Sequence, residues 1–310
     1  MKFLTVTLTR AQNGNGSKPI YPGSLSTLGQ QTRRCWLPCG WLWGAMTLVY
    51  ASQVFAAPPR PLLGVQHVIA HRGASEERPE NTLIAFSHAI CTGATAIEVD
   101  VRSTADGHLV VMHDRDVART TDGKGNVSER TLDQLKQLDA GSHFDAQYAD
   151  QRVPTLAEVL QLAKGQVEVL LDLKEDGGSY AANIAKTVRQ HGDPQRTIIG
   201  VRKVAQAELF RGLLPDSPQL AFISTPTEIA AFAHAGVDAV RLWDRWLTDD
   251  ATLADQVRRL GKRLHINGKT GDLRETQRIM RFAPDWVLVD HPGRLIDSLQ
   301  TIAATAGDGP

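Results

Sequence analysis

The sequence has no net charge excess and contains little cysteine. Its 310 residues include 34 basic and 34 acidic side chains, so the formal net charge at pH 7 is zero. A general nucleic-acid-binding protein normally carries a basic excess, so no nucleic-acid partner is expected. The three cysteines have neither a C-x-x-C spacing nor a Cys/His spacing typical of zinc, which argues against a zinc or dithiol centre.

Two common catalytic and cofactor motifs are also missing. The chain contains no G-x-S-x-G motif, which would mark the nucleophilic serine of an α/β-hydrolase. No glycine-rich dinucleotide-binding turn follows the first apolar strand pattern at residues 67–70. These absences argue against acyl transfer by a serine nucleophile and against a nucleotide-binding doubly wound sheet.

The N-terminal region differs in composition from the rest of the chain. Arg33 and Arg34 precede an uncharged run over residues 35–57 that ends in small residues, the parts of a secretory signal. We therefore expect residues 1–57 to be a signal peptide with a long N-region, and the mature protein to be periplasmic or secreted. The alternatives are a membrane anchor, since the run is long enough to span a bilayer, and a true start downstream of Met1.

From about residue 60 to the end, short apolar runs alternate with helical patterns that have readable caps. Thr155 followed by Glu158, for example, predicts a capping box at a helix start. This alternation predicts a (β/α)8 (TIM) barrel over residues 60–310, with a doubly wound sheet as the alternative. The strand candidates are residues 67–70, 96–101, 109–114, 167–174, 197–201, 220–224, 239–243, 263–267 and 286–290.

One of these nine candidates does not fit a parallel barrel. The link from residue 102 to residue 108 is too short for a parallel crossover, and it contains the turn pair Asp106-Gly107. We expect a hairpin, and a two-residue loop would pair Asp100 with His113 unless a bulge breaks the register. Residues 115–153 then form an insertion, which we expect to be a small lobe over the barrel mouth.

The strand pattern A-I-E-V-D-V places two acids on one face. Glu98 and Asp100 alternate with apolar residues, so their side chains point to the same side of the strand. In isolation this pattern is typical of a half-exposed strand with a solvated face. In a barrel the helices cover the outer face, so the acids are expected to point inside, where paired carboxylates require a neutralising cation.

Polar pairs end two other strand patterns as well. Asp172 and Lys174 share one face of V-E-V-L-L-D-L-K, and His71-Arg72 follows the first strand directly. An ion pair alone would explain one such break, but three strands with polar carboxyl ends indicate a site. Barrel active sites are built at the carboxyl ends of the strands.

The residue types indicate phosphoryl transfer at this site. The three acids on the two strands would hold one divalent cation, Mg²⁺ or Ca²⁺, because hard cations prefer oxygen ligands. Arg72 and Lys174 would bind an oxyanion. His71 and His113 would serve as acid and base.

At this point the sequence resembles a known family. The motifs H-R-G, P-E-N-T, I-E-V-D, T-x-D-G, V-V-x-H-D and R-T-T occur in order, followed by L-D-A-G-S-H-F, R-V-P-T-L-A-E-V-L, L-L-D-L-K and V-D-H-P. This series closely resembles the glycerophosphodiester phosphodiesterase family, and the resemblance covers residues 66–293. A lone H-R-G would be weak evidence, whereas the ordered series is specific.

The resemblance implies a (β/α)8 barrel that hydrolyses glycerophosphodiesters to an alcohol and glycerol 3-phosphate with a bound divalent cation. It implies that His71 and His113 are the acid–base pair and that Arg72 and Lys174 contact the phosphate. Glu80, from P-E-N-T, is implied as a site-lining residue. The implied metal ligands are Glu98, Asp100 and Asp172.

The sequence departs from the family pattern in the later strands. The family usually has glutamate where Asp172 stands, so the shorter arm would shift the metal or admit a water molecule. The usual W-T-V-N strand end is replaced by His265-Ile266-Asn267, and the usual serine–aromatic pair by Val201-Arg202. Arg202 and His265 are therefore candidates for additional substrate contacts, with surface or core roles as the alternative.

These observations lead to one expected function with two alternatives. We expect metal-dependent hydrolysis of glycerophosphodiesters by His/His acid–base catalysis. The alternatives are a lysophospholipase D-like phosphodiesterase with transient membrane contact, and a non-catalytic barrel that binds a phosphorylated head group. The sequence does not indicate the native head group, the choice of cation or the oligomeric state.

Overall fold

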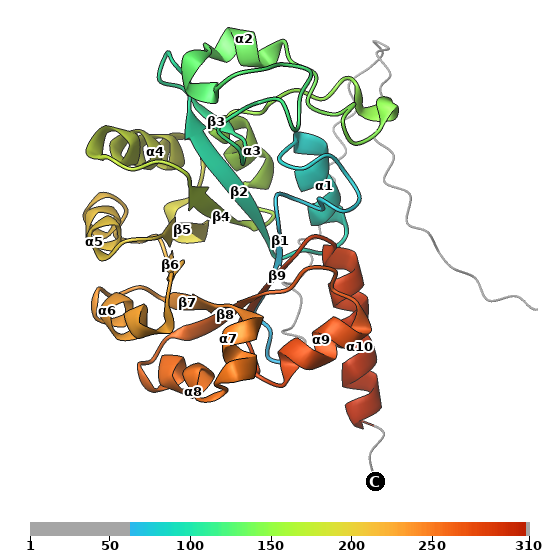
Figure 1. The fold of residues 1–310 in the computed structure, drawn as a ribbon, viewed down its shortest axis with the longest axis vertical. Helices are drawn as coiled ribbons and strands as arrows, with labels where there is room; N and C mark the ends of the chain where they lie inside the picture. The colour runs from blue at the N-terminus through green and yellow to red at the C-terminus, as the bar shows by residue number, and fades with distance from the viewer. Residues whose placement is uncertain (1–62, 308–310) are drawn as a thin grey trace, which may run out of the picture. The chain divides into compact units, whose positions relative to one another are not determined.

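The structure is a computed structural model that describes residues 63–307. The predicted signal segment lies outside the described residues. Within residues 63–307, no helix has the length and apolar character needed to cross a membrane. The described residues contain an eight-stranded parallel barrel with helices around it, so the predicted (β/α)8 fold is confirmed (Figure 1).

The barrel closes where its first strand meets both its second and its last. Strand β1 (His67–Ala70) pairs in parallel with β2 (Ala96–Ser103) and with β9 (Trp286–Val289). The other parallel strands follow in chain order between β2 and β9: β4 (Glu168–Leu173), β5 (Thr197–Val201), β6 (Gln219–Ala221), β7 (Ala239–Leu242) and β8 (Arg263–Asn267).

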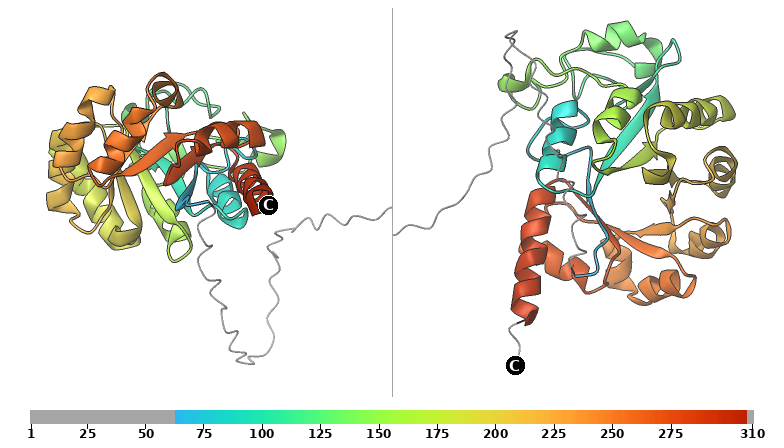
Figure 2. Two further views of the ribbon diagram at one scale, coloured as in Figure 1. Left: turned by 90° about the horizontal axis from the view of Figure 1, so that it is seen from below. Right: turned by 180° about the vertical axis from the view of Figure 1, so that it is seen from behind.

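The helices form the layer around the barrel (Figures 1 and 2). Helix α3 (Leu156–Ala163) begins at Thr155, whose hydroxyl accepts from the N–H of Glu158 while the Glu158 carboxylate accepts from the N–H of Thr155, as predicted. The other helices of this layer are α1 (Leu83–Cys91), α4 (Gly178–His191), α5 (Val204–Leu213), α6 (Ile229–His234), α7 (Asp244–Asp249), α8 (Thr252–Arg259), α9 (Leu273–Met280) and α10 (Pro292–Gly307).

One apolar cluster lies on the outer face of the barrel, and a second lies inside it. The outward residues of β2, Ile97, Val99 and Val101, pack in the large cluster with the helices. The inner cluster contains one to two residues from each of seven strands, together with Phe222: Ile69, Ala96, Leu170, Ile198, Leu220, Phe222, Ala239, Trp286 and Leu288. Glu98 and Asp100 alternate with the outward set, so they point into the barrel as predicted.

The hairpin after β2 has a register that differs from the prediction by one residue. Strand β3 (Leu109–Val111) runs antiparallel to β2. Beyond its end, the N–H of Met112 donates to the carbonyl of Asp100 at 3.0 Å, so Met112 and not His113 lies opposite Asp100. The predicted pairing of Asp100 with His113 is therefore wrong.

A left-handed glycine in the loop accounts for this shift. The loop spans residues 105–107, because the N–H of Thr104 donates to the carbonyl of His108 at 2.9 Å. Gly107 has φ +81°, the conformation that closes a three-residue hairpin loop with a bulge. The predicted turn at Asp106-Gly107 is present, but it is one residue longer than a two-residue loop.

Residues 115–153 lie between β3 and α3 and include helix α2 (Leu132–Lys136), at the top of Figure 1. Short 3₁₀ turns at Val127–Glu129 and Ala146–Tyr148 complete this insertion. Its apolar residues Val117, Val127, Leu135, Ala140 and Val153 form a separate cluster with Val110 and Met112 of the hairpin. This packing holds the segment that carries Arg119 beside the barrel.

Gly200 on β5 lies opposite Asp172 of β4, and replacing it by alanine is expected to destabilise the fold. A Cβ at this position would lie 2.3 Å from Cε2 of Phe222 and 2.7 Å from the carbonyl oxygen of Leu171. The phenyl ring must move to make room, so we expect the free energy of unfolding to fall by about 1–3 kcal/mol, measured by urea denaturation.

Gly212→Ala is the matched control for this prediction. Gly212 lies in α5, and a Cβ there would meet no atom within 4 Å. Alanine is the better helix former, so we expect stability to be unchanged or raised by up to about 1 kcal/mol. An equal loss of stability in both variants would contradict the packing argument.

Candidate active site

The H-R-G turn after β1 brings Arg72 to an acid of β2. Arg72 and Gly73 both have positive φ, +56° and +83°. A Cβ on Gly73 would lie 2.7 Å from the backbone of Ala85 in α1, so the turn requires glycine where it crosses this helix. The turn directs the backbone N–H of Arg72 to the Oε2 atom of Glu98 at 2.9 Å.

Three buried carboxylates converge inside the barrel. Glu98, Asp100 and Asp172 each offer an oxygen, and these oxygens lie within 4.8 Å of one another. The parallel register explains the arrangement, because Asp100 of β2 lies directly opposite Asp172 of β4. The structure thus brings together the three acids that the sequence analysis selected.

Lys174 bridges two of these acids. Its Nζ atom lies 2.8 Å from Oδ1 of Asp100 and 2.6 Å from Oδ2 of Asp172. Arg202, which follows β5, binds both oxygens of Asp172, with its Nη2 atom 2.9 Å from Oδ2. Burial raises the pKa of Asp172, but the hydrogen bond from Arg202 and the charge of Lys174 outweigh it and hold the pKa below its usual value.

Arg72 connects the acid cluster to the P-E-N-T segment. Its Nε atom lies 3.4 Å from Oδ2 of Asp100, and its Nη1 atom donates to Oε1 of Glu80 at 3.0 Å. The amide of Asn81, which has φ +57°, donates to the same Oδ2 of Asp100 at 2.7 Å. Two consecutive residues of the motif therefore connect to the acid cluster. Glu80 does so through Arg72, and Asn81 does so directly.

The acid cluster has the donor set that a hard divalent cation requires. Glu98 is only 2% exposed, and its carboxylate receives the N–H of Arg72 as its one hydrogen bond from the described residues. Burial, with the charge of Asp100, raises the pKa of Glu98 well above its usual value. A divalent cation would stabilise the ionised carboxylate, so the residues present fit such an ion.

The imidazole of His71 is held by a carboxylate from the other end of the chain. Its Nδ1 atom lies 2.6 Å from Oδ1 of Asp290, which follows β9. Burial lowers the pKa of His71, but the hydrogen bond to Asp290 and the charge of Glu98 outweigh it, so the pKa is raised. With Nδ1 bound to Asp290, the Nε2 atom is left for another partner.

His113 has the same arrangement. Its Nδ1 atom lies 2.6 Å from Oδ1 of Asp114, so Nε2 is again left for another partner. Arg102 fixes the backbone here, donating from Nε and Nη2 to the carbonyl of His113 at 3.1 and 2.6 Å. Both imidazole side chains are about one-third exposed or slightly less, 28% for His71 and 34% for His113, so both can reach a solute.

A network of charged residues joins His113 to Arg72. Arg119 of the insertion contacts Asp114 through Nε and Glu80 through Nη1 and Nη2, each of the latter at 2.8 Å. Burial raises the pKa of Glu80, but Arg119 and Arg72 outweigh it and lower the pKa to about 2. Glu80 is therefore ionised at neutral pH and fixes two arginines rather than offering a free carboxylate.

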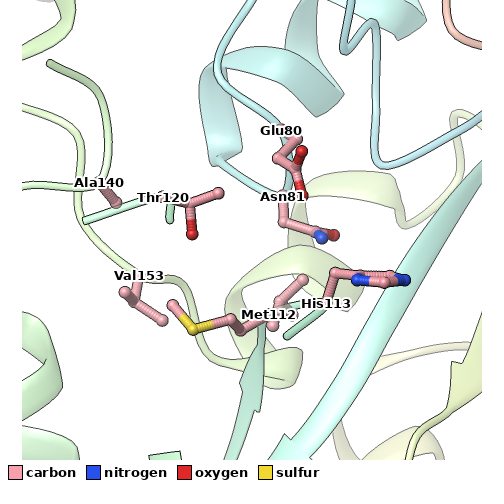
Figure 3. Close-up of a pocket in the computed structure, with 8 residues that line it drawn as sticks. Glu80, Asn81, Met112, His113, Thr120, Ala140 and Val153 are labelled. Carbon is pink, nitrogen blue, oxygen red and sulfur yellow. The ribbon is translucent and has the colours of Figure 1, made fainter. Parts of the chain in front are cut away.

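A small pocket lies beside His113, between the P-E-N-T segment and the insertion (Figure 3). Figure 3 shows the side chains of Met112 and His113 extending in opposite directions, with Asn81 above the imidazole. The pocket is lined by Glu80, Asn81, Val111, Met112, His113, Thr120, Ala140 and Val153.

The two candidates from the later strands lie in different environments. Arg202 reaches the acid cluster through Asp172. His265 is completely buried in the barrel, and neither of its ring nitrogens has a hydrogen-bond partner among the described residues. Burial, with the nearby charge of Arg241, lowers the pKa of His265 to about 3, so it is neutral. This burial argues against direct substrate contact by His265 and favours the core alternative.

Four residues of the network were not assigned by sequence reasoning. Each nevertheless lies inside a motif that the sequence displays, and Asn81 and Asp114 directly follow the assigned Glu80 and His113. Asn81 belongs to P-E-N-T, Asp114 to V-V-x-H-D, Arg119 to R-T-T and Asp290 to V-D-H-P. The motifs therefore indicated that these segments belong to the site. The contacts that explain each residue depend on the fold.

Comparisons with known proteins agree with this geometry. The sequence model of the glycerophosphoryl diester phosphodiesterase family matches residues 71–294. A glycerophosphodiester phosphodiesterase of Caldanaerobacter subterraneus is 43% identical over 137 residues, which cover 43% of this chain and 56% of that protein. One of Bacillus altitudinis is 40% identical over 153 residues, covering 48% of this chain and 62% of its own length.

A solved structure matches over a larger part of the fold. The crystal structure of a glycerophosphodiester phosphodiesterase from Agrobacterium tumefaciens has a TM-score of 0.66 and 26% sequence identity to this chain. The match covers 74% of this chain and 98% of that one. The match therefore spans nearly all of the Agrobacterium protein, whereas the sequence matches span less than two thirds of the two curated relatives.

Proposed function

Because the chain belongs to the glycerophosphoryl diester phosphodiesterase family, we propose that it hydrolyses glycerophosphodiesters to an alcohol and glycerol 3-phosphate. One structural observation supports this proposal in addition to family membership. Two imidazoles, each with Nδ1 held 2.6 Å from a carboxylate, accompany a buried cluster of three acids. A site that moves two protons beside a cation-binding cluster suits hydrolysis of a phosphodiester.

Glu98, Asp100 and Asp172 would hold one divalent cation, Mg²⁺ or Ca²⁺. When bound there, such an ion would polarise the phosphoryl group and offset charge that develops on its oxygens. Arg72 and Lys174 would orient the phosphate, Arg72 through its planar guanidinium and Lys174 as a compact charge. Glu80 would keep Arg72 in place, and Arg202 would keep Asp172 in place.

The two histidines would carry the proton transfers through their Nε2 atoms. One imidazole accepts the proton of the nucleophile. If the nucleophile is water, glycerol 3-phosphate forms directly; if it is the neighbouring hydroxyl of the glycerol moiety, a cyclic phosphodiester forms and a water molecule then opens it to glycerol 3-phosphate. The other imidazole donates a proton to the leaving alkoxide oxygen as its bond to phosphorus breaks. Asp290 and Asp114 hold the Nδ1 protons and stabilise the imidazolium forms, so they are positioning residues.

Replacing Asp290 by asparagine is expected to lower kcat by about 10-fold to about 10⁴-fold. The upper value is the loss seen when the carboxylate that orients the histidine of a serine protease becomes an amide. The pKa of His71 should fall as well, because Asp290 raises it against the effect of burial. The pKa is measured by NMR titration and kcat by phosphodiester hydrolysis.

Asp297→Asn is the matched control, since Asp297 is an exposed acid of α10. It should leave both kcat and the pKa of His71 unchanged. If Asp290→Asn lowered kcat without moving the pKa of His71, the proposed positioning role would be wrong.

The test of the proposed function is hydrolysis of glycerophosphocholine and glycerophosphoethanolamine by the mature protein, with and without EDTA. We expect release of glycerol 3-phosphate only when a divalent cation is present. Tight binding of these compounds without turnover would instead support the non-catalytic alternative. Turnover of lysophospholipids in preference to both compounds would support the lysophospholipase D-like alternative.

We further propose export of the mature protein to the periplasm or medium, on the strength of the arginine pair and the uncharged run over residues 35–57. N-terminal sequencing of the protein isolated from its native host tests this. A mature N-terminus close after residue 57 is expected, and retention of residues 35–57 in a membrane fraction would contradict cleavage.

A further inference from the structure

A group of arginines and aromatic rings lies on the side of the barrel formed by β5, β6 and β7. The guanidinium of Arg241 lies 4.1 Å from the ring centroid of Trp243 and 5.1 Å from that of Phe222. The guanidinium of Arg202 lies 4.9 Å from the ring centroid of Phe222. We define these four residues, Arg202, Phe222, Arg241 and Trp243, as the arginine–aromatic cluster.

Arg241 points into the barrel and shares the ring of Phe222 with Arg202, the arginine that binds Asp172. Its neighbours along β7, Val240 and Leu242, pack outward against the helices. Arg241 pairs in register with the buried His265 of β8. Through Arg202, which binds Asp172, the arginine–aromatic cluster is continuous with the acid cluster.

Arg241 differs from Arg72, Lys174 and Arg202 because it has no acidic partner among the described residues. Within residues 63–307, no carboxylate lies in ion-pair distance of its guanidinium. Among the described residues its one hydrogen bond is from Nη2 to the carbonyl of Ile223 at 3.2 Å, and its Nε atom is buried without a partner there. A half-buried guanidinium with unused donors is costly unless an anion is available to it.

The electrostatic surroundings leave Arg241 charged. Burial, with the positive charge of Arg202, lowers the pKa of Arg241 to about 10, which is still far above neutral. Asp172 is the acid whose negative charge raises the pKa of Arg241. Both oxygens of that carboxylate are already bound by Arg202 and Lys174. The positive charge of Arg241 is therefore not cancelled by a contact within the described part of the chain.

The same arrangement leaves no open aromatic face in the cluster to favour a cationic head group. Aromatic rings in a pocket bind quaternary ammonium groups through their π faces. Here guanidinium groups already lie over the rings of Phe222 and Trp243. A choline group would meet two like charges instead of an open aromatic face.

We infer that Arg241, stacked between Phe222 and Trp243, is an anion subsite that selects glycerophosphodiesters whose alcohol moiety carries a second anionic group, a carboxylate or a phosphate. This inference rests on the proposed function, since it assigns the substrate class of the same site. Arg241 donates to the second anion, while the diester phosphate is held by Arg72 and Lys174. It is a specificity-determining residue and takes no part in the proton transfers.

Two substrates isolate the second anion. Glycerophosphoserine and glycerophosphoethanolamine differ only in the carboxylate of the serine moiety. With the unmodified protein we expect kcat/KM to be at least about 10-fold higher for glycerophosphoserine, because a charge-assisted hydrogen bond to a buried guanidinium is strong. Arg241→Gln should remove this preference while changing kcat/KM for glycerophosphoethanolamine by less than about 3-fold.

Arg263→Gln is the matched control. Arg263 also lies over a tryptophan ring, 5.9 Å from the centroid of Trp286, but it is exposed at the start of β8, opposite Ala239 and not at the level of Arg241. It should retain the preference for glycerophosphoserine. Equal losses on both substrates in Arg241→Gln would show a packing role and overturn the inference.

A binding measurement keeps the inference separate from the proposed function. Calorimetric titration with O-phosphoserine and phosphoethanolamine should show tighter binding of O-phosphoserine by the unmodified protein and no difference in Arg241→Gln. Equal affinity, or equal hydrolysis of both diesters, overturns the inference and leaves the proposed function intact. Absence of any diester hydrolysis overturns the proposed function, while the binding preference still decides the anion subsite.

Discussion

Replacing either His71 or His113 by alanine is expected to lower kcat by about 10²- to 10⁴-fold, the usual cost of removing a group that transfers a proton in the transition state. Each imidazole has its Nδ1 atom 2.6 Å from a carboxylate, so each presents one oriented nitrogen to the substrate. KM should change much less than kcat, since the phosphate contacts remain. Steady-state hydrolysis of a glycerophosphodiester with cation in excess measures both constants.

The two histidine variants should also differ in their pH dependence. Loss of the general base removes one limb of the pH–rate profile, and loss of the general acid removes the other. A leaving group with a low pKa, such as p-nitrophenol, needs no protonation and should restore activity to the variant that lacks the acid. That restoration assigns the two roles, which the geometry alone leaves symmetric.

His234→Ala is the control for both variants. His234 is an exposed histidine of α6, on the outer layer of helices. It should have wild-type kcat. If His71→Ala and His113→Ala both retained kcat within about 3-fold, acid–base catalysis by this pair would be wrong, because proton transfer is worth far more than that.

The second large effect is expected on removal of the cation or of a residue that holds it. EDTA should abolish hydrolysis, and Mg²⁺ or Ca²⁺ added in excess should restore it. Asp100→Asn should weaken cation binding by at least about 100-fold, because even partners outside the ligand shell are worth 10–100-fold in affinity. Isothermal titration with each ion measures the affinity without reference to turnover.

Asp100→Asn also tests how much of the site is held by charge alone. Asp100 is 1% exposed and faces both Arg72 and Lys174. Removing its charge leaves these cations with fewer partners, at a cost of about 3–5 kcal/mol for a buried pair. Thermal unfolding in the presence of EDTA separates this loss of stability from the loss of cation binding.

Asp176→Asn is the control for the metal prediction. Asp176 lies shortly after β4 but pairs with Lys203 in an exposed ion pair, which contributes little to stability. Cation affinity and kcat should both be unchanged. Hydrolysis that persists in EDTA at the wild-type rate would exclude a role for the cation.

Sequence reasoning located the acids because strand periodicity has a simple consequence in a barrel. The alternation in A-I-E-V-D-V puts Glu98 and Asp100 on one face, and the helices can cover only the apolar face. The same logic placed Asp172, which lies level with Asp100 through the parallel register of β2 and β4. The face of a residue follows from two neighbours in the sequence, so it is predictable.

Depth along a strand is not predictable in the same way. His265 points inward as its position in β8 requires, but it lies entirely within the packed interior. The missed register of the hairpin has a related cause, because a single left-handed Gly107 lengthens the loop and shifts every later partner by one. The depth of His265 and the register of the hairpin both depend on loop conformations and on the packing of other strands.

Contacts between distant segments were the least accessible to sequence reasoning. Asp290 holds His71 from 219 residues away, and Arg119 joins Glu80 from 39 residues away across the insertion. Arg241 was part of a predicted strand, yet nothing in its local sequence shows that it has no acidic partner among residues 63–307. That property depends on every residue around it, so it emerges only from the fold.

The pairing of β1 with β9 has a consequence for when the protein becomes active. The residues after these two strands, His71 and Asp290, can meet only once the last strand has joined the first. A folding intermediate that contains β1 to β8 would already have the acid cluster but would leave His71 unoriented. Recovery of activity during refolding should therefore follow the slowest, sheet-closing phase and lag behind the appearance of secondary structure. Turnover in this protein would thus report closure of the barrel between its first and last strands.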